Sequence, residues 1–160
     1  MADFKIRFVS ESNFGSGVVE FFEGGSHWSH TEIVLPDGKY LGARRVGGVA
    51  IRNSDYITNI NHERRYSIPV TDDAYTKIMD FAMSQIGKKY DISLILGIAF
   101  HKNWHNKNEW DCSEYVTSSA IQGDLYFLNV EPNYTYKVTP ETLHLSPILM
   151  GHCYYSYARQ

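Results

Sequence analysis

The chain has 160 residues, of which 43% are hydrophobic and 21% are charged, with a formal net charge of −3. This is the composition of an ordinary globular protein, and it lacks the basic excess that favours nucleic acid or an anionic membrane as a partner. The length predicts one domain over residues 1–160, which can bury a core without a disulfide or a metal.

The N-terminus has no basic stretch followed by a long apolar run, so we expect no signal peptide. The longest apolar stretch, 92–100, is much shorter than the roughly 20 residues that a membrane-spanning helix needs. These features predict a protein that is cytoplasmic as synthesised and spans no membrane. Action at a cell wall or in a virion would require delivery by other means.

The first 70 residues show the alternation of apolar and polar side chains that is typical of β-strands. Strands are predicted at 4–9, 31–35, 39–43, 50–52 and 65–70, with one or two helical turns at 14–22 and a loop at 23–26. Pro36-Asp37-Gly38 lies between the second and third strands, and the Asp-Gly pair favours a hairpin turn there.

The hydrophobic period changes to that of a helix after Thr71, which is a typical N-cap residue. Asp72 and Asp73 would occupy the first turn, and Gly87 would end the helix. The expected buried face consists of Ala74, Ile78, Phe81, Ala82 and Ile86. This is the most regular helical pattern in the chain.

A polar and aromatic loop is predicted at 101–110, followed by a second helix that begins near Cys112. The expected buried stripe of this helix is Cys112, Tyr115, Val116, Ser119 and Ala120. Thr139 and Pro140 predict the start of a short helix that runs to about residue 146, and 148–157 is a candidate final strand. Together the elements predict an α+β domain with a mainly antiparallel sheet.

Cys112 is the strongest candidate for a reactive side chain, because a helix N-terminus favours an ionised thiol. A thiolate needs a base, and His30 opens a predicted strand, which would hold an imidazole more rigidly than a loop. A disulfide between Cys112 and Cys153 is disfavoured by this nucleophile-like context. The residues alone leave open that Cys112 is a small core residue and His30 a surface residue.

Three short motifs carry a resemblance to a known family. They are Ser29-His30-Thr31-Glu32-Ile33-Val34 with the Asp37-Gly38 turn, then Gly87-Lys88-Lys89-Tyr90, then Asp111-Cys112-Ser113. In this order they resemble the circularly permuted form of NlpC-type papain-like amidases, the YiiX-like branch. Unpermuted members carry Gly-x-x-Tyr and Asp-Cys-Ser-Gly before a His-Val-Gly-Ile-Tyr strand. The resemblance implies a circularly permuted papain-like fold, with an antiparallel sheet packed against helices and the nucleophile at a helix N-terminus.

The resemblance also implies roles for particular residues. Cys112 would attack an amide carbonyl, His30 would take the thiol proton, and the Tyr90 hydroxyl would lie near the oxyanion or the substrate carbonyl. A Cys112 sulfur within about 4 Å of a His30 ring nitrogen is therefore expected. The implied substrate is a peptide or a peptidoglycan fragment, and no cofactor or metal is implied.

Two positions depart from the family pattern. The third polar residue that usually orients the histidine falls near Gly42, which has no side chain. Glu32 lies two residues from His30, on the same face of the strand, and either orients the imidazole or is solvated, with solvation slightly favoured. Glu114 replaces the glycine after Cys-Ser, and a carboxylate in the first helical turn would oppose formation of the thiolate.

Other functions remain open from the sequence. Related permuted folds suggest an acyltransferase or a lipid esterase with an acyl lipid as substrate, and the missing side chain at Gly42 suggests a binding module that has lost catalysis. A zinc site is disfavoured, because the pairs His27/His30 and His101/His105 lack a His-Glu-x-x-His or Cys-x-x-Cys context. The cluster of Trp104, His105 and Trp110 would either grip a substrate or pin its own loop.

Overall fold

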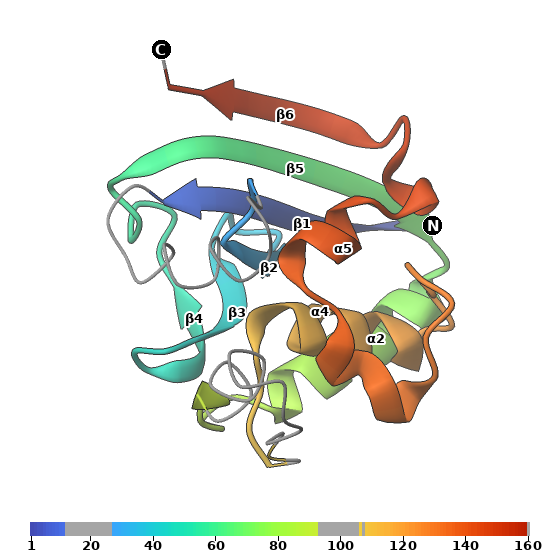
Figure 1. Ribbon diagram of the computed structural model, residues 1–160. Helices are drawn as coiled ribbons and strands as arrows, with labels where there is room; N and C mark the ends of the chain where they lie inside the picture. Colours follow the sequence, from blue (N-terminus) through green and yellow to red (C-terminus); the bar gives the residue numbers. More distant parts are fainter. Residues whose placement is uncertain (12–26, 93–105, 107, 160) are drawn as a thin grey trace.

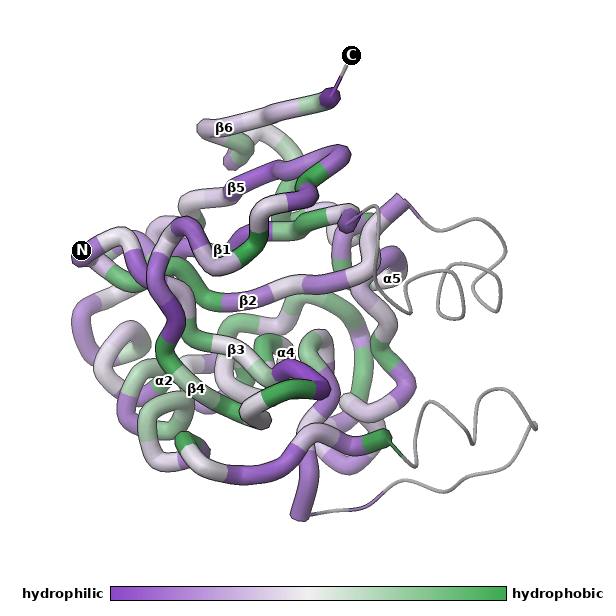
Figure 2. Tube along the Cα trace, turned by 90° about the vertical axis from the view of Figure 1, so that its left-hand side faces the viewer, coloured by the Kyte–Doolittle hydropathy of each residue, from purple (hydrophilic) through white to green (hydrophobic). Residues whose placement is uncertain are grey.

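In the described part of the chain, six strands form one antiparallel sheet with the order β4-β3-β2-β1-β5-β6. The computed structural model describes residues 1–11, 27–92, 106 and 108–159. The strands are β1 (Ala2–Glu11), β2 (His30–Val34), β3 (Tyr40–Arg44), β4 (Gly48–Arg52), β5 (Ile60–Val70) and β6 (Cys153–Ala158). Figure 2 shows them succeeding one another in this order from one edge of the sheet to the other.

Helices cover one face of this sheet (Figure 1). They are α2 (Asp72–Ser84), α4 (Cys112–Gln122) and α5 (Pro140–His144), with short 3₁₀ helices η1 (Pro132–Lys137) and η2 (Pro147–Leu149). The α+β architecture with an antiparallel sheet, expected from the sequence, is thereby confirmed. The predicted segments 14–22 and 23–26, and most of the predicted loop at 101–110, lie outside the described residues.

Each strand predicted within the described residues is present. Leu35 accepts a hydrogen bond from the Gly38 amide, with an N–O distance of 2.9 Å, and Gly38 has a φ of +81°, so the Asp-Gly turn closes the β2–β3 hairpin as expected. The final strand starts later than predicted, at Cys153, because η2 occupies the residues before it.

Thr71 caps α2 as predicted, since its hydroxyl accepts the Ala74 amide at 3.1 Å. Ile78 and Ala82 lie on the buried face of this helix, but Ile86 is 45% exposed, so the prediction for Ile86 was wrong. The helix ends at Ser84, and the chain then runs along the edge of β4, where the Gly87 amide donates to the carbonyl of Val49.

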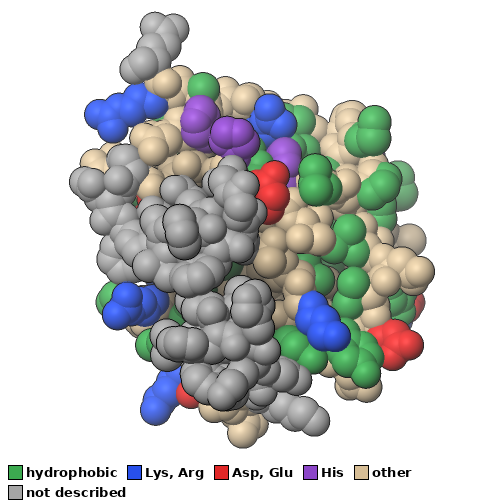
Figure 3. Space-filling model, viewed as in Figure 1, with side chains coloured by type: hydrophobic (Ala, Val, Ile, Leu, Met, Phe, Trp, Pro, Cys, Tyr) green, Lys and Arg blue, Asp and Glu red, His purple; other side chains and the backbone are tan. Residues whose placement is uncertain are grey.

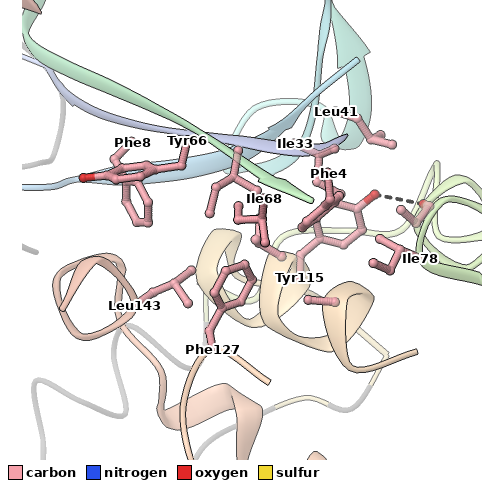
Figure 4. Close-up of a cluster of buried hydrophobic side chains, with 14 of the residues drawn as sticks. Phe4, Phe8, Ile33, Leu41, Tyr66, Ile68, Ile78, Tyr115, Phe127 and Leu143 are labelled. Carbon is pink, nitrogen blue, oxygen red and sulfur yellow. Dashed lines mark hydrogen bonds between the residues drawn. The ribbon is translucent and has the colours of Figure 1, made fainter. Parts of the chain in front are cut away.

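The sheet has two buried faces of opposite character. Because side chains alternate along a strand, Phe4, Ile6 and Phe8 of β1 lie on one face with their cross-strand neighbours Ile33 and Ile68. Figure 4 shows side chains of this apolar face meeting Tyr115 of α4, Ile78 of α2 and Phe127. Helix α4, predicted to be amphipathic, is buried from Cys112 to Ile121.

The polar face is defined by Arg7, His30, Glu32, Tyr40, Glu63 and Arg65, which come from four neighbouring strands. Arg7 is 1% exposed and Glu32 is 0% exposed, and the two form an ion pair across β1 and β2. The Arg7 guanidinium also lies over the Tyr40 ring, 3.3 Å from its centroid. A buried network of charged groups thus lies directly behind the hydrophobic core.

Candidate active site

Cys112 is the first residue of α4, and Asp111 is the N-cap. One oxygen of the Asp111 carboxylate, Oδ1, accepts the backbone amides of Ser113 and Glu114 at 2.8 and 2.9 Å. The cap satisfies two of the amides that a helix start leaves unpaired and fixes the direction of the helix. Cys112 is 4% exposed, so its thiol lies in a buried environment at the positive end of the helix dipole.

Tyr90 lies beside Cys112. An isolated β-bridge pairs Tyr90 with Trp110, and the Trp110 amide donates to the Lys89 carbonyl at 3.0 Å. Burial raises the pKa of the Tyr90 phenol well above 10, and Cys112 and Asp111 raise it further through their charges and a hydrogen bond to Cys112. The phenol therefore stays protonated at neutral pH and is a hydrogen-bond donor next to the candidate nucleophile.

Glu114 is buried in the first turn of α4. Burial raises the pKa of its carboxyl from 4.5 to about 9, and the neighbouring charge of Asp111 contributes in the same direction. We take Asp111 as the ionised member of this pair, because its Oδ1 accepts two backbone amides and the Ser113 hydroxyl. A protonated Glu114 carries no charge that opposes a thiolate, so the objection raised by the sequence does not apply at neutral pH.

His30 and Glu32 form a buried pair. His30 Nε2 lies 3.3 Å from Glu32 Oε2, and the Tyr56 hydroxyl donates to the same carboxylate oxygen at 2.8 Å. Glu32 is fully buried, so the slightly favoured expectation that it is solvated was wrong. Because a carboxylate only accepts hydrogen bonds, we assign the imidazole proton to Nε2, which leaves Nδ1 as the basic nitrogen.

Electrostatics keep His30 neutral and Glu32 ionised. Burial alone would raise the pKa of Glu32, but the Arg7 charge and hydrogen bonds from His30 and Tyr56 lower it to about 2. Burial lowers the pKa of His30, and the nearby charge of Arg44 lowers it too, against the opposing effect of Glu32. At neutral pH the pair is therefore a neutral imidazole beside a carboxylate.

Gly42 provides the space for this arrangement. A Cβ atom at Gly42 would lie 2.7 Å from the Cβ of Glu32 and 3.3 Å from its Oε2. The residue opposite Glu32 on β3 must therefore be very small. Glu32 therefore packs against Gly42, the residue at which the sequence lacks the expected polar side chain.

The four candidate residues thus form two pairs, Cys112 with Tyr90 and His30 with Glu32. Helix α4 packs against β2 and β3, and Arg44 at the end of β3 acts electrostatically on both His30 and Tyr90. His30 points to the polar face, whereas α4 packs on the apolar face, so the two pairs can meet only around the ends of β2 and β3. The distance between Cys112 Sγ and the His30 ring stays a prediction.

The histidines considered as zinc ligands either contact other side chains or lie outside the described residues. Figure 3 shows histidine side chains gathered on one part of the surface, and the rings of His27 and His62 lie 6.1 Å apart. His101 and His105 lie outside the described residues. Within the described ranges, no group of three or more His, Cys, Asp or Glu side chains could hold a metal ion.

Trp110 is held by its own surroundings. Its indole nitrogen donates to Gln85 Oε1 at 3.2 Å, and its ring meets Phe81 and Tyr115 edge-on. This fits the interpretation of a pinned loop for Trp110, while Trp104 and His105 lie outside the described residues. Cys112 and Cys153, which both lie in the described part, form no disulfide, and Cys153 is exposed.

Sequence reasoning did not identify Tyr56, Arg44 or Arg7 as part of the site. Tyr56 lies in the loop between β4 and β5, where no periodic pattern indicates its partner.

No protein-family model matches the chain, and no curated protein shows significant similarity to it. Among the residues that the structure describes, no helix is long and apolar enough to cross a membrane. The chemistry of these two pairs is therefore the main indication of function.

Proposed function

We propose that the protein is a cysteine hydrolase that cleaves an amide bond, with Cys112 as the nucleophile and His30 as the base. The observation that carries the proposal is the buried thiol of Cys112 at the first position of α4, in contact with the protonated phenol of Tyr90. A helix N-terminus stabilises a thiolate, and an adjacent donor suits the oxyanion that forms on the attacked carbonyl.

In this mechanism His30 Nδ1 accepts the thiol proton, and the thiolate of Cys112 attacks the carbonyl carbon. The backbone N–H of Cys112 and the Tyr90 hydroxyl donate to the oxyanion. His30 returns its proton to the leaving amine, and water then releases the acyl group from the sulfur. Glu32 orients the imidazole and stabilises the imidazolium.

A circularly permuted papain-like fold of the YiiX-like branch is part of this proposal. The antiparallel sheet, the nucleophile at a helix start and the proximity of Tyr90 to Cys112 support it. The close packing of Glu32 against Gly42 also supports it. Glu32 stands where the family's histidine strand has glycine, and Gly42 stands where the family has its polar residue. By this resemblance, the proposed substrate is a cell-wall peptide.

A binding module that has lost catalysis is the second candidate. One observation favours it, namely that the His30 side chain points to the polar face while α4 packs on the apolar face. In such a module Cys112 would be an ordinary buried thiol, which reacts slowly with alkylating reagents.

Limited alkylation with iodoacetamide at neutral pH, read by mass spectrometry, separates the two candidates. Exposure alone predicts faster labelling of Cys153, because Cys112 is 4% exposed and Cys153 lies on the surface. The hydrolase proposal predicts the reverse order, by about 10-fold or more, because a lowered thiol pKa raises reactivity. His30→Ala should slow Cys112 labelling, whereas the matched change His62→Ala should not.

Equal labelling of the two cysteines, or faster labelling of Cys153, would contradict the proposal. Hydrolysis of small peptides and peptidoglycan fragments then tests the reaction itself. Wild type should release an amine and Cys112→Ala should not. Activity that survives in Cys112→Ala would exclude the cysteine mechanism.

A further inference from the structure

A cavity of about 370 Å³ lies between the β3–β4 turn and the loop that joins β4 to β5. Its walls include Glu11, Arg44, Arg45, Val46, Arg52 and Ile57. Three cationic side chains face one carboxylate, so the lining has an excess of positive charge. Its volume lies in the range of sites that bind small molecules or single side chains.

The Arg52 guanidinium is fixed in this wall by the backbone. It donates to four carbonyl oxygens of the β3–β4 hairpin at 2.8–3.2 Å. Burial lowers the pKa of Arg52, and the nearby charge of Arg44 lowers it further. All four of these hydrogen-bond partners of Arg52 are neutral carbonyl groups. An anion in the cavity would therefore stabilise the charged guanidinium.

Arg44 connects the cavity to the candidate active site. Its guanidinium pairs with Glu11 at 2.9 Å and donates to the Tyr56 hydroxyl at 3.0 Å. Tyr56 lines the cavity and also donates to Glu32, which contacts His30. A group bound in the cavity therefore lies one side chain away from the His30–Glu32 pair.

We propose that this cavity binds the carboxylate of an acidic peptide substrate, with Arg45 as the main hydrogen-bonding partner and Arg52 as a fixed charge behind it. The inference builds on the proposed function, since an amide substrate that carries an anionic group is most simply a peptide with a carboxylate. The guanidinium groups of Arg44 and Arg52 already donate to protein oxygens, while Arg45 lines the cavity and is exposed. One guanidinium fork matches one carboxylate through two parallel hydrogen bonds.

The test uses the full chain as the Cys112→Ser variant, so that binding is measured without turnover. The probes are the blocked peptides acetyl-Ala-Glu-Ala-amide and acetyl-Ala-Gln-Ala-amide, titrated into ¹⁵N-labelled protein at low ionic strength. The glutamyl peptide should bind about 10-fold more tightly than the glutaminyl peptide. Its amide shifts should concentrate in residues 44–48 and 53–59.

Arg45→Gln should remove this preference for the glutamyl peptide. The matched control, Lys39→Gln, removes one exposed positive charge from the β2–β3 turn, at the opposite end of β3 from Arg45, and should leave the preference unchanged. Thermal melts of both variants confirm that the fold is intact. If Lys39→Gln lost the preference to the same degree, the preference would depend only on the overall charge of the protein, and the proposal would be overturned.

Two other results would also overturn it: equal affinity for the two peptides, or inorganic phosphate that binds at the same amides more tightly than the glutamyl peptide does. The proposed function can fail separately. If Cys112 alkylates slowly in the wild type while the glutamyl peptide still binds at 44–48 and 53–59, the cavity is confirmed as a carboxylate site and only the catalytic proposal is lost.

Discussion

Both faces of the sheet contain fully buried side chains, but different physical reasons hold them there. On the apolar face, removal of each large side chain from water stabilises the fold by about 1.5–3 kcal/mol, and no exact geometry is required. On the polar face, Arg7 and Glu32 are 1% and 0% exposed, yet the cost of desolvating two charges offsets most of their attraction. Burial alone therefore does not indicate what holds a residue in place.

This difference suggests what each face contributes. The apolar face supplies stability to the sheet and to α4, which presents Cys112. The polar face depends on specific partners, and the partners of Glu32 are Arg7, Tyr56 and His30. We infer that the polar face is maintained for the position and the charge state of His30 more than for stability.

The largest effect is expected when one member of the polar face is removed. Arg7→Met leaves Glu32 as a buried carboxylate without its main counter-charge and should destabilise the protein by about 3–5 kcal/mol. The double variant Arg7→Met/Glu32→Leu should regain most of this loss, because it removes both charges. Urea unfolding of the single and double variants measures both values.

Lys5→Met, on the same strand and the same face, is the matched control and should change stability by less than about 1 kcal/mol. The double variant should also label Cys112 more slowly than wild type, since His30 loses its carboxylate partner. A double variant as unstable as Arg7→Met would contradict the view that the ion pair contributes little net stability.

On the apolar face, Phe8→Ala should cost about 3–5 kcal/mol, because the side chain is fully buried against Trp28, Tyr66 and His144. Under native conditions it should leave the ratio of Cys112 to Cys153 labelling unchanged. The exposed residue Leu145 serves as the control, and Leu145→Ala should stay within about 0.5 kcal/mol of wild type. A large change in the labelling ratio of Phe8→Ala would mean that the two faces are not separate in function.

Gly42→Ala tests the packing of the polar face and should cost about 1–3 kcal/mol, since the added Cβ would lie 2.7 Å from the Glu32 Cβ. In a Glu32→Gly background the same change should cost much less, and a double-mutant cycle measures this coupling. Gly38→Ala, which meets no atom within 4 Å but has a φ of +81°, should cost the same in both backgrounds. Equal costs for Gly42→Ala in the two backgrounds would show that Glu32 does not limit this position.

The elements that the sequence predicted are those with local signals. The Asp37-Gly38 turn, the Thr71 cap and the strand β1 each depend on neighbours within a few residues, and each is present as expected. Periodicity predicts a buried Ile86, but it does not indicate that the helix ends at Ser84, and Ile86 is exposed.

The polar face could not be predicted in the same way. The alternation of β1 suggests that Arg7 faces solvent, but it is buried by an ion pair with a residue 25 positions away and by the ring of Tyr40. Glu32, for which the sequence slightly favours solvation, is also fully buried. The partners of a buried charge come from the register between strands, and a single sequence does not contain that register. The same limit applies to Tyr56, whose loop has no periodic pattern.

The smallest effect concerns Glu114, a buried carboxyl on the helical side of the molecule. Its pKa is raised from 4.5 to about 9 in the folded protein, so the stability that it contributes is complete below pH 4.5 and is lost as the pH rises to about 9. Glu114→Gln replaces a neutral carboxyl with a neutral amide and removes this dependence. Between pH 6 and 9, the melting temperature of wild type should therefore fall by at least about 2–4 °C more than that of Glu114→Gln, which corresponds to roughly 1 kcal/mol for a chain of this size. The exposed residue Glu131 is the control, and Glu131→Gln should follow wild type. Parallel melting curves for wild type and Glu114→Gln would mean that Glu114 is ionised near neutral pH, and its charge would then oppose a thiolate at Cys112.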